Sequence, residues 1–211
     1  MEMLLAARRI ADHAKDEGVL YRQVGARASC QHMGGILADA VLQSGLNYKS
    51  VVRPRVVAIL RLYPEKDTTS SLMEVVEEGM TSSFLNWNHP QKIARFERLV
   101  CFLQDRNIEL ARDLKNHLQD AEFCEEIQGV NGVGPKTVDY MACLVGVDSI
   151  AVDRHVRNFA KRVGVSNDDY LFLRKVFCFA ADLLELSRRD FDAWIWSRES
   201  SSSSRQLSFA V

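Results

Sequence analysis

The sequence "NGVGPKT" at residues 131–137 combines two glycines, a proline and a lysine just before a periodic apolar segment. Gly132 and Gly134 favour a tight turn in which the backbone can approach another molecule closely. Pro135 suits the first position of a helix, where its missing N–H leaves no hydrogen bond unmade. The stretch therefore predicts a turn and a helix that turns Lys136 away from its buried face, which consists of Val138, Met141, Ala142 and Val145.

The composition is that of an ordinary globular protein of 211 residues, with 47% hydrophobic and 26% charged residues. A formal net charge of −1 argues against a surface that is basic overall but allows a local basic region. The cysteines are widely spaced without a CxxC pair, which argues against a disulfide framework or a zinc site. The absence of a long apolar run and the charged N-terminal segment lead us to expect a soluble intracellular protein.

Periodic apolar segments predict an all-α fold of about ten or eleven helices with short connections. The pattern Ser71-x-x-Glu74 predicts a capping box at the start of one helix, and a long helix is expected within 90–106. A short helix in "DAEFCEEIQ", residues 120–128, precedes the glycine turn, so the turn belongs to a helix–hairpin–helix. The backbone N–H groups at such a turn bind anions, phosphate above all, although a plain turn between packed helices is the alternative.

Lys136 and Asp153 are the candidate reactive residues. Lys136 lies in the first turn of its helix, where the helix dipole disfavours the ammonium form and is expected to lower the pKa of the amine. A neutral amine is a nucleophile, whereas the plain alternative is a solvated surface lysine. Asp153, in "SIAVDRHV" at residues 149–156, is expected to cap the next helix and to present its second carboxylate oxygen to a cleft.

The segment 130–164, "VNGVGPKTVDYMACLVGVDSIAVDRHVRNFAKRVG", resembles the signature of the helix–hairpin–helix DNA glycosylase superfamily, which includes endonuclease III and the 8-oxoguanine glycosylases. That superfamily carries a hairpin of the form L-P-G-V-G-x-K-T-A followed by V-D-x-H. Here the hairpin has Asn131 in place of the proline, and the second motif consists of Val152, Asp153, Arg154 and His155. A weaker likeness extends through most of residues 30–200.

The resemblance implies two helical lobes with a DNA and lesion cleft between them. The implied divisions are N-terminal helices at 1–34 packing with the C-terminal lobe, a six-helix barrel-like lobe at 35–152 with the hairpin at 129–136, a C-terminal helical lobe at 153–199, and a flexible serine-rich tail at 200–211.

The resemblance also implies base-excision repair of double-stranded DNA by a monomer that flips a damaged nucleotide, most closely 8-oxoguanine, out of the duplex. Lys136 would attack C1′ of the sugar and Asp153 would stabilise the developing cation, so that the enzyme is both a glycosylase and an AP lyase. The residues implied to contact DNA are Asn131, Gly132, Val133, Gly134 and Thr137.

Only Cys178 follows Asp153, so the four-cysteine iron–sulfur cluster of endonuclease III is not expected, and the cluster-free 8-oxoguanine type is favoured. No metal or cofactor is expected, although a monovalent cation at the hairpin is compatible with the resemblance. The glutamine that endonuclease III inserts into the duplex aligns with Gly45, two residues after Gln43. The expected location is a bacterial or archaeal cytoplasm at the nucleoid, or the nucleus if the source is eukaryotic.

Three alternatives remain open: a glycosylase for oxidised pyrimidines, a non-catalytic helix–hairpin–helix module that holds DNA, and a helical scaffold without a nucleic-acid role. His155 is expected to be structural, and three tryptophans are candidates for base stacking or for the core: Trp87, Trp194 and Trp196. The candidate phosphate contacts are Lys92, Arg95, Arg98, Arg154, Arg157, Lys161 and Arg162.

Overall fold

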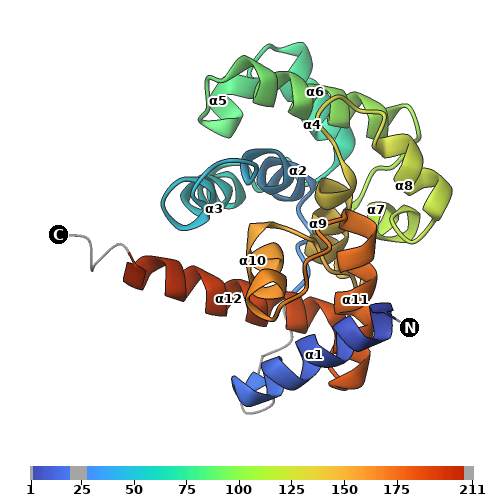
Figure 1. The fold of residues 1–211 in the computed structure, drawn as a ribbon. Helices are drawn as coiled ribbons and strands as arrows, with labels where there is room; N and C mark the ends of the chain where they lie inside the picture. Colours follow the sequence, from blue (N-terminus) through green and yellow to red (C-terminus); the bar gives the residue numbers. More distant parts are fainter. Residues whose placement is uncertain (1, 20–27, 207–211) are drawn as a thin grey trace. The chain divides into compact units, whose positions relative to one another are not determined.

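The computed structural model describes residues 2–19 and 28–206, and these residues form α-helices and one π-helical turn without a strand (Figure 1). The predicted all-α class is therefore confirmed. The elements are α1 (Glu2–Asp16), α2 (Met33–Leu42), η2 (Tyr48–Val52), α3 (Arg53–Leu62), α4 (Thr69–Glu77), α5 (Thr81–Leu85), α6 (Pro90–Gln104), α7 (Ala111–His117), α8 (Ala121–Ile127), α9 (Pro135–Val145), α10 (Arg154–Arg162), α11 (Tyr170–Leu183) and α12 (Arg188–Gln206).

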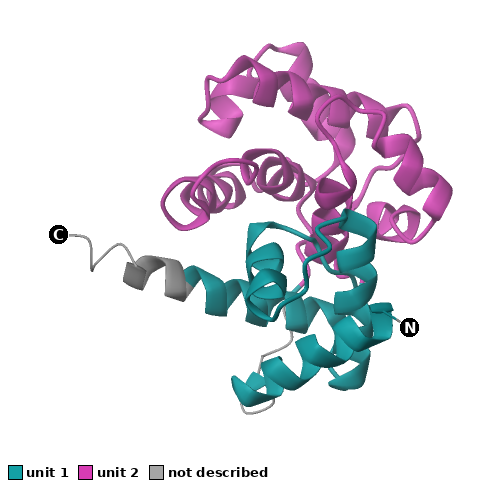
Figure 2. Ribbon diagram, viewed as in Figure 1, with its two compact units in different colours: residues 1–28, 148–211 teal, residues 29–147 magenta. Residues whose placement is uncertain are grey.

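The chain divides into two compact units (Figure 2). The central unit comprises residues 29–147, and the terminal unit comprises residues 1–28 together with 148–211. The expected boundary at residues 34 and 35 would fall inside α2. The segment that precedes α10 belongs to the terminal unit because α12 holds it: the Arg189 N–H donates to Asp148 at 3.1 Å, and the Ala151 N–H donates to Asp192 at 3.3 Å.

The central unit is built around α2. Its sequence "MGGILADAVL" is apolar on almost every side, and each of its residues is buried. The neighbouring helices α3, α4, α6 and α9 pack against it. A helix with no exposed face has to lie inside a bundle, so α2 is the centre around which the other helices of this unit pack.

The start of α4 differs from the prediction. The capping box is formed by Thr68 and Ser71, with the Ser71 N–H donating to Thr68 Oγ1 at 3.2 Å. The expected box at Ser71 and Glu74 is wrong because the preceding threonine begins the helix at Thr69. Glu74 instead forms an ion pair with Lys66 at 2.7 Å.

The terminal unit has its own apolar core, in which α1 packs against α11, and α10 packs against α12. Aromatic rings fill its centre, with Phe159 meeting Phe177 and Trp194 edge to face. Trp194 is 3% exposed, which confirms its place in the core. The serine run 200–204, expected in a flexible tail, lies in α12, whereas residues 207–211 of that expected tail lie outside the described residues.

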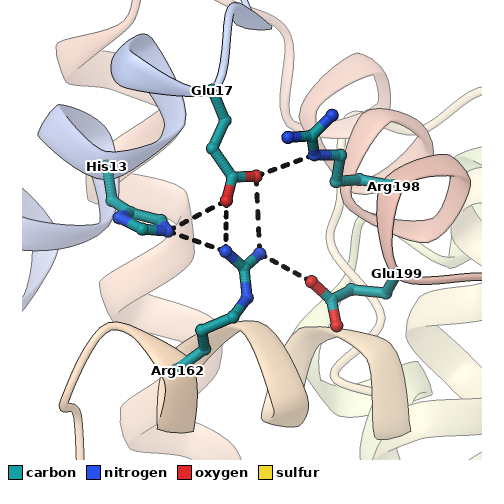
Figure 3. Close-up of polar contacts among 5 residues, drawn as sticks. All are labelled: His13, Glu17, Arg162, Arg198 and Glu199. Atoms are coloured by element: carbon teal, nitrogen blue, oxygen red, sulfur yellow. Dashed lines mark hydrogen bonds and ion pairs between the residues drawn. The ribbon is translucent and has the colours of Figure 1, made fainter. Parts of the chain in front are cut away.

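Charged residues tie three helices of the terminal unit together at one point (Figure 3). Arg162 of α10 forms ion pairs with Glu17, which follows α1, and with Glu199 of α12. Arg198 of α12 also pairs with Glu17, at 2.9 Å. Opposite charges alternate through this cluster, so each charge in it meets at least one of opposite sign. Within the described ranges, no helix is long and apolar enough to cross a membrane.

Candidate functional site

The glycine turn connects α8 to α9 as the sequence predicts. Gly132 has φ +84°, a left-handed conformation that residues with side chains adopt only with strain. Gly134 caps α9 with an extended backbone, and Pro135 is the first residue of the helix. The turn and the start of the helix are therefore confirmed at the predicted residues.

The backbone of the turn leaves its glycine N–H groups uncovered. The Val133 N–H donates to Val130 O and the Thr137 N–H donates to Gly134 O, both at 2.9 Å. In the described part of the chain, no acceptor takes the N–H of Gly132 or Gly134. These two donors lie at the start of a helix of eleven residues, a position in which N–H groups bind anions.

Two of the expected DNA contacts, Val133 and Thr137, have roles inside the turn. The side chain of Val133 is 4% exposed and belongs to the core of the central unit. Thr137 is likewise buried, at 8%. Because their N–H groups are already used within the turn, they hold its shape, and Gly132, Gly134 and the exposed Asn131 form its outer surface.

Arg95 of α6 is a second reason why residue 132 has to be glycine. A Cβ atom on Gly132 would lie 2.2 Å from Nε and from Nη2 of Arg95. The guanidinium therefore lies directly against the glycine backbone. The absence of a side chain at residue 132 lets a fixed positive charge sit beside the turn.

Lys136 is partly buried, and its amine meets Gln43. Nζ donates to Oε1 of Gln43, which follows directly after α2, and it lies 6.0 Å from the centre of the Tyr140 ring. The Nε2 atom of Gln43 is buried and meets no acceptor among the described residues. The neutral amide oxygen of Gln43 is thus one of the groups that hold the amine in place.

A second polar layer lies one helical turn from this contact. Asp39 of α2 is 4% exposed, and its two oxygens accept hydrogen bonds from Tyr140 at 3.0 Å and from Tyr48 at 3.2 Å. Gln43, the residue directly after α2, lies four residues after Asp39, as Tyr140 lies four residues after Lys136 on α9, so the two packed segments present matching pairs. A buried carboxylate needs such donors, and their bonds fix the spacing of the two helices.

Lys92 of α6 lies near the same place and has a different role. Its amine donates to three backbone carbonyls at the end of α2, those of Val41 at 2.9 Å, Leu42 at 3.3 Å and Ser44 at 2.8 Å. Burial, followed by repulsion from Arg95 and Lys136, lowers the pKa of the Lys92 amine to about 8. Its three hydrogen bonds satisfy carbonyls that α2 would otherwise leave unpaired, so Lys92 caps a helix.

Asp153 caps α10 as predicted. Its Oδ1 accepts hydrogen bonds from the N–H groups of His155 at 2.7 Å and Val156 at 3.1 Å. Across the described residues, no donor reaches Oδ2. Asp153 belongs to the terminal unit, whereas Lys136 and the glycine turn belong to the central unit.

The cysteines of the chain are free thiols dispersed over both units. Among residues 2–19 and 28–206, no group of three or more His, Cys, Asp or Glu side chains is placed to hold a metal ion. Comparisons with protein-family models, with curated proteins and with solved structures found no match to this chain.

Gln43 and Arg95 lie next to the turn and its lysine, but no sequence pattern predicted these contacts. Both are more than thirty residues away from the turn along the chain, so local spacing carries no sign of the contacts. Asp39 gave one indirect signal, because a carboxylate in an apolar helix requires polar partners nearby. That signal predicts a polar cluster but does not say which residues complete it.

Proposed function

We propose that this protein is a DNA glycosylase with AP lyase activity that removes an oxidised base from double-stranded DNA. The proposed main substrate is 8-oxoguanine. The observation that carries the proposal is the position of Lys136. It lies in the first turn of α9, shortly after two glycines whose N–H groups meet no acceptor in the described part of the chain. An amine beside an anion-binding turn is placed to react with a sugar while the turn holds the adjoining phosphate. The lesion cleft between two lobes stays a prediction of the resemblance.

In the proposed reaction, the neutral amine of Lys136 donates its lone pair to C1′ of the flipped nucleotide. The bond from C1′ to the base breaks, and the base leaves with the bonding electrons and takes up a proton. Loss of an amine proton and opening of the C1′–O4′ bond then give a Schiff base. Removal of a proton from C2′ expels the 3′ phosphate by β-elimination and cuts the strand.

The residues around Lys136 support a positioning role. Gln43 accepts an N–H of the amine, and because its amide oxygen is neutral, this contact does not favour the ammonium form as a carboxylate would. Asp39 holds Tyr140, over which the amine lies, through a hydrogen bond of 3.0 Å.

Asp153 is the proposed stabiliser of the developing sugar cation. Its capping hydrogen bonds involve Oδ1, so Oδ2 is available to a positive charge. The same bonds fix the orientation of the carboxylate. Helix capping and charge stabilisation are therefore compatible in one residue.

Borohydride trapping tests this function. The protein is incubated with duplex DNA containing 8-oxoguanine, thymine glycol or an abasic site, and the Schiff base is reduced to a stable adduct. We expect an adduct that is absent in Lys136→Gln and retained in Lys115→Gln, an exposed lysine of α7. The substrate that gives the most adduct identifies the lesion, and thymine glycol in that place would favour the oxidised-pyrimidine alternative.

A DNA-binding module without catalysis is the second candidate, because N–H groups at a glycine turn hold phosphate without any chemistry. It predicts that DNA binding is intact and that none of the three substrates yields an adduct. Retention on DNA that weakens steeply with salt would in turn exclude a helical scaffold.

A further inference from the structure

Two arginines of α6 lie beside the glycine turn. Arg95 and Arg98 are three residues apart on the helix, so their side chains project from neighbouring positions on one face. Together with Asn131 of the turn they line a hollow of about 410 Å³. The remaining lining residues are uncharged: Pro90, Gln91 and Ala94. The hollow therefore carries positive charge without a balancing carboxylate in its wall.

The candidate cations from the sequence separate into two groups in the structure. Arg157 pairs with Asp168 at 2.8 Å, Arg162 pairs with two glutamates, and Lys92 donates to backbone carbonyls. No hydrogen bond or ion pair links Arg95 or Arg98 to any residue in the described ranges. The Nε atom of Arg95 is buried and meets no acceptor among residues 2–19 and 28–206.

A buried donor without an acceptor costs free energy, which an incoming oxygen would recover. The charges nearby act in the same direction. Arg95 and Lys136 both lie close enough to Lys92 to lower the pKa of its amine, so three cations gather at this edge of the central unit. In a chain whose formal net charge is −1, such a gathering is a local feature and favours an anionic ligand.

We propose that Arg95, Arg98 and Asn131 form a binding site for a phosphate of the DNA backbone, next to the phosphate held by the N–H groups of Gly132 and Gly134. The proposal rests on the proposed function and extends its DNA contact from the turn onto α6. The planar fork of an arginine matches the oxygens of a phosphodiester, and such contacts set the position of a protein on a strand.

A neighbouring hollow of about 750 Å³ is less suited to a phosphate than the hollow beside Arg95. It shares Arg98 and Asn131 with the smaller hollow. Its wall, however, also contains three carboxylates, those of Glu97, Asp105 and Glu126. These would repel a phosphate, so the strand is directed to the side of Arg95.

The test is the salt dependence of binding to an undamaged, fluorescently labelled DNA duplex. Removing one phosphate contact lowers the slope of log K against log salt by about 0.9. We expect this change in Arg98→Gln, whose exposed side chain is not needed for folding. Arg95→Lys keeps the charge but loses the fork, so it should weaken binding several-fold and leave the slope nearly unchanged. Arg112→Gln, which removes an exposed arginine of α7 outside both hollows, is the matched control.

An unchanged slope in Arg98→Gln, together with unchanged affinity in Arg95→Lys, would overturn the site. This outcome is distinguishable from failure of the proposed function. If the slope changes as expected but no adduct is trapped, the phosphate site stands and the lyase does not. If an adduct forms on Lys136 while both arginine variants bind as the wild type does, the lyase stands and the phosphate site does not.

Discussion

Two groups of charged side chains in this molecule are built in opposite ways. In the terminal unit, Arg162 and Arg198 alternate with Glu17 and Glu199, and each charge faces at least one of the other sign (Figure 3). In the central unit, Lys92, Arg95 and Lys136 gather beside the glycine turn, and among the described residues no carboxylate pairs with Arg95 or Arg98, which line the hollow next to it.

The difference separates charges that serve the fold from charges that serve a ligand. A balanced cluster offsets its own cost of burial, so removing one member leaves the others unpaired. A cluster of like charges destabilises the protein until an external anion arrives. The two groups should therefore respond to substitution with opposite signs.

Arg162→Gln is expected to give the largest change in stability. Glu17 and Glu199 are 15% and 10% exposed in their side chains, and the substitution leaves both with weaker partners. We expect a loss of about 2–3 kcal/mol in the free energy of unfolding, measured by urea denaturation. Arg8→Gln, which removes an exposed pair with Asp12, should cost less than about 0.5 kcal/mol. Equal losses in the two variants would remove the distinction for the terminal unit.

Gly132→Ala tests the structural side of the cation cluster. The left-handed backbone costs an alanine about 1–2 kcal/mol, and the new methyl group must displace the guanidinium of Arg95. Gly134→Ala is the matched control, since φ there is −109° and a Cβ would meet nothing within 4 Å. Thermal unfolding should separate the two variants, whereas DNA binding should weaken in both. A stable Gly132→Ala protein would contradict the packing of Arg95 on the turn.

The pH dependence of stability provides a third comparison. Burial opposes ionisation of Glu17, but hydrogen bonds and charges from Arg162 and Arg198 outweigh it and lower the pKa of its carboxyl below 4.5. Below pH 4.5 the Glu17 carboxyl takes up a proton more readily in the unfolded chain than in the folded protein. The stabilisation by ionised Glu17 is therefore fully present above pH 4.5 and is lost as the pH falls through the pKa of the folded protein. The difference in free energy of unfolding between wild type and Glu17→Gln should be about 1 kcal/mol at pH 7 and should vanish in acid. A difference that is constant down to pH 2 would contradict the role of the charge.

Arg98→Gln is expected to give the smallest change and the opposite sign. Removing one of two neighbouring cations on α6 should raise the free energy of unfolding by about 0.3 kcal/mol at low salt. The gain should disappear at high salt because the repulsion is screened. A loss of stability instead would mean that Arg98 has an internal partner.

The glycine turn shows what the sequence could establish. Gly132, Gly134 and Pro135 fix the turn and the start of α9 through backbone conformation alone, so these features could be predicted locally. The cap at Asp153 followed in the same way. The prediction of a capping box at Ser71 was wrong because Thr68, three residues earlier, has an equivalent hydroxyl group. No local pattern favours Ser71 or Thr68 as the cap.

The surroundings of Lys136 could not be predicted, since they depend on packing between distant helices. Gln43 reaches the amine only because α2 lies against α9. The expectation of a lowered amine pKa rested on the helix dipole at Lys136. That expectation stays a prediction, whereas burial and neighbouring cations, which no local pattern encodes, lower the pKa of Lys92 to about 8.

The most direct measurement locates the lysine that carries the adduct. DNA trapped with borohydride is digested, and the modified peptide is identified by mass spectrometry. The competing nucleophiles are the N-terminal amine and Lys92, whose pKa is lowered to about 8, whereas position beside the turn favours Lys136. We expect modification of Lys136 alone. Modification of Lys92 or of the N-terminus would contradict this expectation, and so would the absence of any adduct on DNA that the protein binds.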